Sequence, residues 1–318
     1  MNYDLHGVAI RFETSDPRLA ARLDKQWQPF TPSGPLPAPA VRFRLRAVAE
    51  TPPAPAFAAV SSGPVVVYHR QGELVSAYFR RWGRYDIDLA AGTVDGAMTE
   101  ACLSVYGVFE DMIVIALAPL LRRRGLFTLH AFAAARGGRA AVLVGDIGAG
   151  KTTTGLSLLC GGYKLCANDS PLLRFDDGGG VRVCAYPGLI SAYPDSISWF
   201  PPLAPVLAAA ERLDGSAKLS FSADHLWPDA WQKEAEPGAL LFPQVTPGLS
   251  ASVLRPLARF AALQRLVGQS VENWDADFIP PHLQALRILA NAVPAFELLL
   301  APDVDRLPAL IGEAMGGS

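Results

Sequence analysis

The sequence predicts an α/β fold over residues 96–318, preceded by a smaller α+β domain over residues 1–95. Two observations support this organisation. An apolar strand pattern at residues 140–144 runs through a glycine-rich turn into a helix pattern at residues 153–159, which is the strand–turn–helix order of α/β proteins. Before the glycines of residues 92–96, alternating strand patterns dominate and no group of catalytic side chains stands out.

Composition places the chain among ordinary folded proteins. It has 318 residues, is half apolar and carries a net charge of −2, which disfavours a nucleic-acid partner. The most apolar run, residues 112–121, is too short to cross a bilayer, and the first residues lack the pattern of a signal peptide. Four cysteines in apolar stretches without C-x-x-C spacing suggest reduced core residues: Cys102, Cys160, Cys166 and Cys184. We therefore expect a cytoplasmic protein without a membrane partner, and self-association stays open.

The N-terminal third reads as strands and one helix. A strand is expected over residues 3–12, and Asp16 is expected to cap an amphipathic helix that ends at Trp27. Proline-rich segments then separate further strand patterns at residues 41–48, 65–69, 74–79 and 85–89.

The rest of the chain alternates strands and helices. A long helix is predicted over residues 99–124, and strands are predicted over residues 126–135 and 140–145 with a turn at Gly137 and Gly138. Later strands are predicted at residues 163–167, 171–175, 181–186, 239–245 and 295–300, and later helices at residues 258–266, 282–292 and 303–315.

The turn after the strand at residues 140–144 matches the pattern G-x-x-x-x-G-K-[ST]. Glycines let backbone amides curl around phosphate oxygens, and the helix that follows adds unpaired N–H groups. Lys151 would contact the β- and γ-phosphates, and the Thr152 hydroxyl would ligate magnesium. A glycine turn without a ligand is the alternative, but it leaves the Lys-Thr pair unexplained. The expected nucleotide contacts are Gly145, Asp146, Ile147, Gly148, Ala149, Gly150, Lys151, Thr152 and Thr153.

The hairpin predicts where one histidine lies. If Gly137 and Gly138 form the turn, Arg136 faces Arg139, and counting back along the strands places His130 opposite Gly145. A histidine would then lie beside the phosphate loop. The alternative is a histidine that is only packed in its strand, and one bulge would change the register.

An acid follows the strand after the loop helix. Asp169, next to Asn168, would lie at a strand end where a carboxylate can hold magnesium or its water. Asn-Asp also begins turns, so a turn is the alternative. Lys218 could reach a phosphate or be solvated.

Residues 126–175 resemble the catalytic domain of the HPr kinase/phosphorylase family and its diverged kin, which include tailoring kinases of lasso-peptide pathways. The shared order is a strand histidine, a hairpin, GDIGAGKT, a helix ending in glycine, and a strand ending in a polar-acidic pair. The resemblance implies a P-loop kinase fold similar to the nucleotide domain of phosphoenolpyruvate carboxykinase, with ATP and Mg²⁺ as cofactors.

The resemblance also implies roles for the site residues. It implies phosphorylation of a serine hydroxyl on a peptide, protein or small metabolite, with His130 as the active-site histidine and Asp169 as the second acid of a pair. Lys151 and these two residues would carry the chemistry. Asn168 stands where the family has its first aspartate, and an amide accepts no proton at neutral pH. The alternative function is a nucleotide-binding accessory or regulatory protein that transfers nothing.

Overall fold

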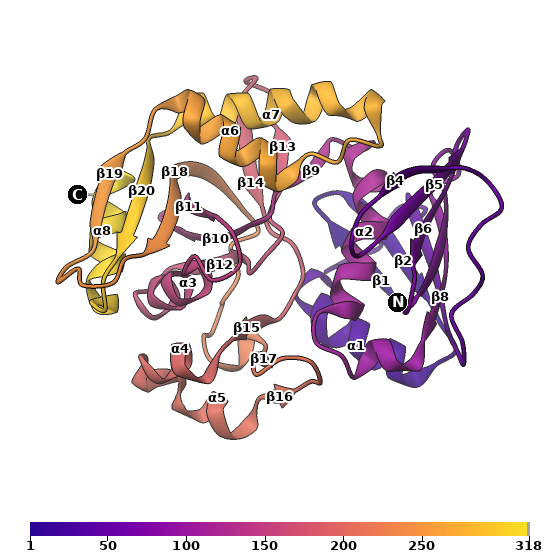
Figure 1. Cartoon of the computed structure of the whole chain (residues 1–318), viewed down its shortest axis with the longest axis horizontal. Helices are drawn as coiled ribbons and strands as arrows, with labels where there is room; N and C mark the ends of the chain where they lie inside the picture. The colour runs from indigo at the N-terminus through magenta and orange to yellow at the C-terminus, as the bar shows by residue number, and fades with distance from the viewer. Residues whose placement is uncertain (317–318) are drawn as a thin grey trace. The chain divides into compact units, whose positions relative to one another are not determined.

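The structure is a computed structural model that describes residues 1–316 and shows a mixed α/β protein with several sheets (Figure 1). The predicted α/β class is therefore confirmed at that level. The chain forms two compact units. Unit 1 consists of Met1–Arg124, Leu213–Ser216 and Glu272–Asp277; unit 2 consists of Gly125–Arg212, Ala217–Val271 and the described residues from 278 to 316.

Unit 1 ends later than the expected boundary at residue 95, because helix α2 (Val108–Arg122) packs within it. Met112 of α2 lies against Cys102 and close to Gly83 of the N-terminal sheet. Glu110 of the same helix accepts hydrogen bonds from Arg22 in helix α1 (Pro17–Trp27). The apolar face of α2 thus completes the core of unit 1.

An eight-stranded sheet forms the centre of unit 1, in the order β1-β2-β3-β8-β7-β6-β5-β4. Its strands are β1 (Asn2–Leu5), β2 (Val8–Glu13), β3 (Val41–Val48), β4 (Ala59–Ser62), β5 (Val67–Gln71), β6 (Leu74–Phe79), β7 (Gly83–Asp88) and β8 (Thr93–Thr99). The single strand expected over residues 3–12 is wrong, since His6 and Gly7 turn the chain with φ of 55° and 86°. The expected cap is confirmed, because Asp16 accepts a hydrogen bond from the Arg18 amide at 2.8 Å.

A nine-stranded sheet forms the centre of unit 2. Its path is β12-β10-β11-β18-β14-β13-β9, and β20 pairs with both β18 and β19. The strands are β9 (Leu126–Thr128), β10 (Ala131–Arg136), β11 (Arg139–Val144), β12 (Lys164–Ala167), β13 (Leu172–Phe175), β14 (Val181–Cys184), β18 (Glu234–Val245), β19 (Val253–Pro256) and β20 (Ala295–Leu300). Strand β11, which leads into the glycine-rich loop, pairs antiparallel with β10 and parallel with β18.

Helices cover both faces of this sheet (Figure 1). Alternate residues of β10 point to opposite faces, so Phe132 joins one apolar cluster and Ala133 joins the other. The first cluster includes α3 (Lys151–Cys160) and α8 (Leu307–Ala314), and the second includes α6 (Arg259–Ser270) and α7 (Ile279–Ala292). The sheet is therefore buried between two helical layers.

A small three-stranded sheet lies within the part of unit 2 that follows β14. Its order is β15-β17-β16, formed by β15 (Ile190–Ala192), β16 (Glu211–Arg212) and β17 (Leu219–Phe221). Two short helices accompany it, α4 (Pro194–Ser198) and α5 (Ala204–Ala209). Their buried Ile197 and Val206 belong to the same apolar cluster as α3.

Short 3-10 turns complete the chain. They are η1 (Gln28–Phe30), η2 (Glu100–Leu103), η3 (Pro201–Leu203), η4 (Ala223–His225), η5 (Ala276–Phe278) and η6 (Val304–Arg306). Among the described residues, no helix is both long and apolar enough to cross a membrane.

Candidate phosphate-binding site

The glycine-rich loop connects the end of β11 to the first turn of α3. Gly148 and Gly150 adopt φ values of 84° and 104°, in the left-handed region that glycine enters at little cost. A Cβ atom at Gly150 would lie 2.4 Å from Leu300 Cδ1, whereas a Cβ at Gly148 would meet no atom within 4 Å. The loop therefore needs glycine for its conformation at both positions, and for close packing against β20 at Gly150.

Lys151 lies under this loop and is 8% exposed. Its ammonium donates to the carbonyl oxygens of Gly145 at 2.5 Å and Asp146 at 3.2 Å. Burial lowers the pKa of Lys151, the charges of Asp169 and Asp146 oppose that shift, and the charge of Lys218 adds to it. A buried cation held by two neutral carbonyls has few charged partners, and it suits an incoming anion.

Two further loop residues contact side chains from distant parts of unit 2. The Thr153 hydroxyl donates to Ser196 Oγ in α4 at 3.0 Å, and Gln269 Nε2 at the end of α6 donates to Asp146 Oδ1 at 2.7 Å. Ile147 at the loop tip is 91% exposed. The base of the loop is thus fixed by side chains while its tip is open.

His130 lies where two strands separate. The single strand expected over residues 126–135 is wrong, because β9 pairs with β13 while β10 pairs with β11 and β12. The expected hairpin register is confirmed from Arg136 opposite Arg139 to Ala131 opposite Val144. His130 and Gly145 come next on their two strands, just beyond the last paired residues.

Asp169 is in the short loop that follows β12, and its side chain lies beside that of His130. His130 Nδ1 lies 3.5 Å from Asp169 Oδ1, and the side chains are 37% and 55% exposed. The Asp169 carbonyl accepts the Ala131 amide at 3.0 Å, which fixes the backbone between these two side chains. Ala131, which follows His130, lies opposite Val144 at the start of the glycine-rich loop, so the acid and the histidine lie beside the loop that carries Lys151.

The neighbouring Asn168 is placed differently. Its Oδ1 atom is buried and has no hydrogen-bond partner among the described residues. A buried acceptor without a donor costs roughly 1–3 kcal/mol, so this atom is suited to a water or a ligand group.

The donor groups fit a phosphate and a magnesium ion. Backbone amides of a glycine loop, a buried ammonium and the first turn of α3 favour phosphate oxygens. A hydroxyl on Thr152 and a carboxylate on Asp169 are oxygen ligands of the type that magnesium prefers.

Sequence reasoning missed several members of this neighbourhood. Ser196, Gln269 and Leu300 reach the loop from α4, α6 and β20, and no motif marks them. The apolar patterns at residues 258–266 and 295–300 predicted α6 and β20, whereas no pattern predicted the helix α4.

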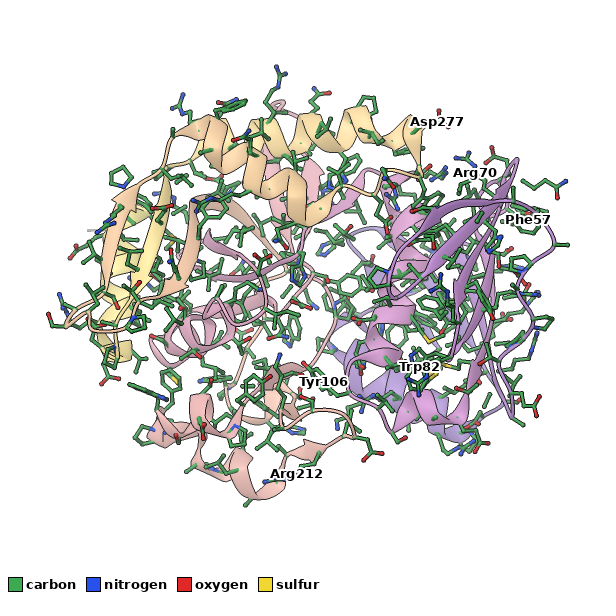
Figure 2. All side chains as sticks on the ribbon, viewed as in Figure 1. Phe57, Arg70, Trp82, Tyr106, Arg212 and Asp277 are labelled. Atoms are coloured by element: carbon green, nitrogen blue, oxygen red, sulfur yellow. The ribbon has the colours of Figure 1, made fainter. Side chains whose placement is uncertain are left out.

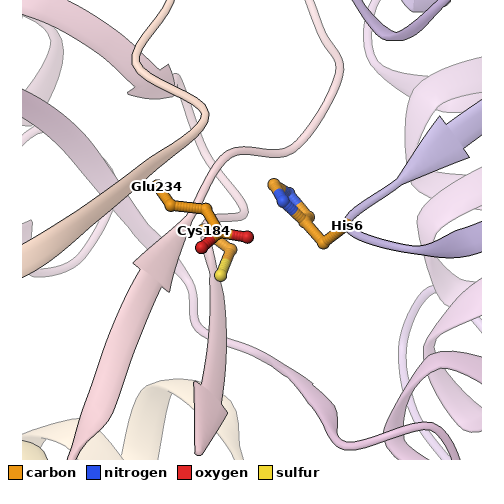
Figure 3. A group of neighbouring side chains, drawn as sticks. All are labelled: His6, Cys184 and Glu234. Carbon is orange, nitrogen blue, oxygen red and sulfur yellow. The ribbon is translucent and has the colours of Figure 1, made fainter. Parts of the chain in front are cut away.

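The cysteines correspond only partly to expectation. Cys102, Cys166 and Cys184 are buried free thiols, but Cys160 at the end of α3 is exposed, contrary to the core position expected for it. Cys184 and Glu234 pair across β14 and β18 (Figure 3). Burial, with a further contribution from the Glu234 charge, raises the pKa of the Cys184 thiol to about 12. A thiol of this kind is unreactive at neutral pH.

The comparisons with known proteins show a distant structural likeness to solved structures and no match of other kinds. No family model matches the chain, and no curated protein matches it. Among solved structures, the Hpr(Ser) kinase/phosphatase from Coxiella burnetii is 15% identical, covers 59% of this chain and 88% of its own, and has a TM-score of 0.32.

Proposed function

We propose that this protein is an ATP- and Mg²⁺-dependent kinase that phosphorylates a hydroxyl, with serine as the expected acceptor, on a peptide, protein or small metabolite. The observation that carries the proposal is the glycine loop with Lys151 buried beneath it and His130 and Asp169 beside it. A P-loop kinase fold and a cytoplasmic location with reduced thiols belong to the same proposal.

The reaction requires positioning more than covalent help from the protein. The acceptor oxygen forms a bond to the γ-phosphorus, the bond from that phosphorus to the bridging oxygen breaks, ADP leaves, and the hydroxyl proton passes to a base. Magnesium bound with the nucleotide neutralises the charge of the phosphates. The loop amides and Lys151 hold the phosphate chain, and Thr152 and Asp169 are the residues that would hold the metal.

His130 and Asp169 are the two groups in the proposed site that can take the proton. They lie 3.5 Å apart, so a proton accepted by one can be stabilised by the other. Asn168 cannot serve, because a neutral amide does not accept a proton at this pH. In the proposed reaction Asn168 therefore orients the acceptor or a water and does not act as the base.

Choice of the acceptor is assigned in this proposal to the N-terminal domain. Unit 1 has its own apolar core but, among its described residues, no motif for transfer chemistry. Along β3 of its sheet, Arg42, Arg44 and Arg46 are exposed while Val41, Phe43 and Leu45 are buried, so this strand presents a basic side to solvent.

A second function rests on Asn168. An amide in place of an acid is compatible with a nucleotide-binding accessory or regulatory protein that transfers nothing. The two functions predict the same nucleotide affinity and differ only in transfer. Incubation with γ-labelled ATP, serine-containing peptides and cell extract separates them, since only the kinase labels a second species.

The test of the phosphate site is Lys151→Ala. Loss of the buried ammonium removes a charge-assisted contact, so ATP affinity should fall by about tenfold to a hundredfold. Lys164→Ala is the matched control, since Lys164 lies on β12 and pairs with Asp229 at the surface. Isothermal titration with ATP and magnesium measures both. Equal affinity in wild type and Lys151→Ala would remove the basis of the proposal.

A further inference from the structure

A second lysine lies close to the phosphate loop. Lys218 immediately precedes β17, and Tyr193 immediately follows β15. Since Ala192 and Leu219 are the last paired residues of these two strands, Tyr193 and Lys218 leave the small sheet at the same end. The Lys218 ammonium lies 5.4 Å from the centre of the Tyr193 ring, which is a cation–π distance.

This lysine is connected to the loop helix through α4. Tyr193 is the residue before α4, and Ser196 in that helix accepts the hydrogen bond of Thr153 at 3.0 Å. Ile197 is fully buried in the cluster that also contains Leu156 of α3, which anchors α4 against the loop helix. The distance between Lys218 and the loop is therefore set by packed elements.

The charges point to an anion. Tyr193, α4 and Thr153 connect Lys218 to the first turn of α3, where Lys151 also lies, and two ammonium groups at the same end of one helix repel. Asp146 and Asp169 offset part of that repulsion, but Asp146 already accepts from Gln269, and Asp169 is the carboxylate assigned to the metal. A polyphosphate placed between the two lysines would be attracted by both.

We propose that Lys218 is a second phosphate-binding cation of the nucleotide site, held in place by the Tyr193 ring. The inference rests on the proposed function and adds to it a contact outside the glycine loop. It predicts that the contribution of Lys218 grows with the charge of the ligand, from AMP through ADP to ATP. A solvated lysine would contribute the same small amount to all three.

The experiment measures the affinity of the full-length chain for ATP, ADP and AMP by isothermal titration. Lys218→Ala should weaken ATP binding by about tenfold to a hundredfold and change AMP binding less than about twofold. Lys218→Arg keeps the positive charge, so its loss of ATP affinity should be smaller than that of Lys218→Ala. Tyr193→Phe keeps the aromatic ring and should bind ATP with wild-type affinity. Tyr193→Ala should bind ATP with an affinity between those of the wild type and Lys218→Ala.

Lys233→Ala is the matched control. Lys233 also lies over an aromatic ring, 5.7 Å from the centre of Trp231, but it is not among the charges that act on Lys151. Lys218→Gln is a second variant for the case in which the alanine variant does not fold, and melting temperatures show that each variant is folded.

The outcomes separate the inference from the proposed function. If the wild-type protein binds ATP and Lys218→Ala binds it equally well, the inference is overturned and the phosphate loop stands. A uniform loss across ATP, ADP and AMP also overturns it, because that pattern reports a structural defect. If the wild-type protein binds none of the three nucleotides, the proposed function and the inference fall together.

Discussion

At the scale of single residues, a substitution of His130 is the most direct test of the proposed reaction. It lies just beyond the last paired residues of β10 and β11, and its imidazole is next to the carboxylate of Asp169. The His130 side chain is 37% exposed, so it contributes little to the apolar core. Its removal should therefore cost chemistry more than stability.

His130→Ala should keep ATP affinity within about threefold and lower the rate of phosphoryl transfer by about a hundredfold or more. Single-turnover transfer and melting temperature are measured on the same sample. His225→Ala is the control, since His225 is exposed in the η4 turn. A variant that melts at a lower temperature but transfers at the wild-type rate per folded molecule would assign His130 to packing.

The residues of this site differ in how far sequence alone could predict them. Lys151 and Thr152 follow from a local motif, and His130 follows from a two-residue turn and a count along two short strands. Ser196 and Gln269 lie 43 and 123 positions away from the loop residues that they contact. Such contacts depend on how separate elements pack, and no local pattern encodes that packing.

At the scale of elements, the fit between α3 and β10 positions the loop. Gly155 is in the middle of α3, and a Cβ atom there would lie 2.4 Å from the Phe132 ring. Glycine ordinarily weakens a helix by about 1 kcal/mol relative to alanine. In α3 the added methyl group of an alanine would collide with the Phe132 ring, which outweighs the gain in helix propensity, because Phe132 is fully buried and has no open space to move into.

Gly155→Ala should accordingly destabilise the protein by about 1–3 kcal/mol, although alanine is the better helix former. Gly268→Ala in α6 is the matched control, since a Cβ there would meet no atom within 4 Å. The control should be neutral or more stable by up to about 1 kcal/mol. Urea unfolding of both variants gives the comparison. A gain in stability for Gly155→Ala would show that α3 is free to move away from β10.

Element boundaries were predictable where the cause is local. The cap at Asp16 and the strand β20 were expected with the right bounds. The helix expected over residues 99–124 begins only at Val108, because Gly107 before it has a φ of 76° and a separate turn precedes it. The break between β9 and β10 was missed, since its cause is that two different partner strands compete for one apolar run.

At the scale of the whole molecule, a six-residue segment from the second half of the chain completes unit 1. Glu272–Asp277 lies between α6 and α7 in sequence but belongs to the first compact unit. Trp274 of this segment stacks on Tyr68 with ring centres 4.5 Å apart, and Glu272 accepts from the Tyr68 hydroxyl at 2.8 Å. A boundary drawn along the sequence could not include this segment, because nothing in its composition marks it as part of the N-terminal domain.

Asp275 is the buried centre of this segment. It is fully buried and makes two hydrogen bonds with Arg123, at 2.8 and 3.0 Å. Its carboxylate also lies 3.3 Å from Arg122 Nε and 3.7 Å from Arg70. A single carboxylate therefore neutralises part of the charge of three arginines, two of which come from the end of α2.

Asp277 offers the contrast two positions later. It is 76% exposed and lies 3.9 Å from Arg70 (Figure 2). Exposed ion pairs at this distance contribute little to stability, because solvent screens the charges and the side chains lose freedom when they pair.

Asp275→Asn should therefore lower the free energy of unfolding by about 3 kcal/mol, since it removes the buried carboxylate that binds Arg123 through two hydrogen bonds and that Arg122 Nε also contacts. Asp277→Asn should change that free energy by less than about 0.5 kcal/mol. Because Asp275 belongs to unit 1, the loss should appear as faster proteolysis of the N-terminal domain, while ATP affinity measured on the folded fraction stays unchanged. Equal stability of the two variants would mean that the arginines find other partners and that Asp275 does not anchor the segment.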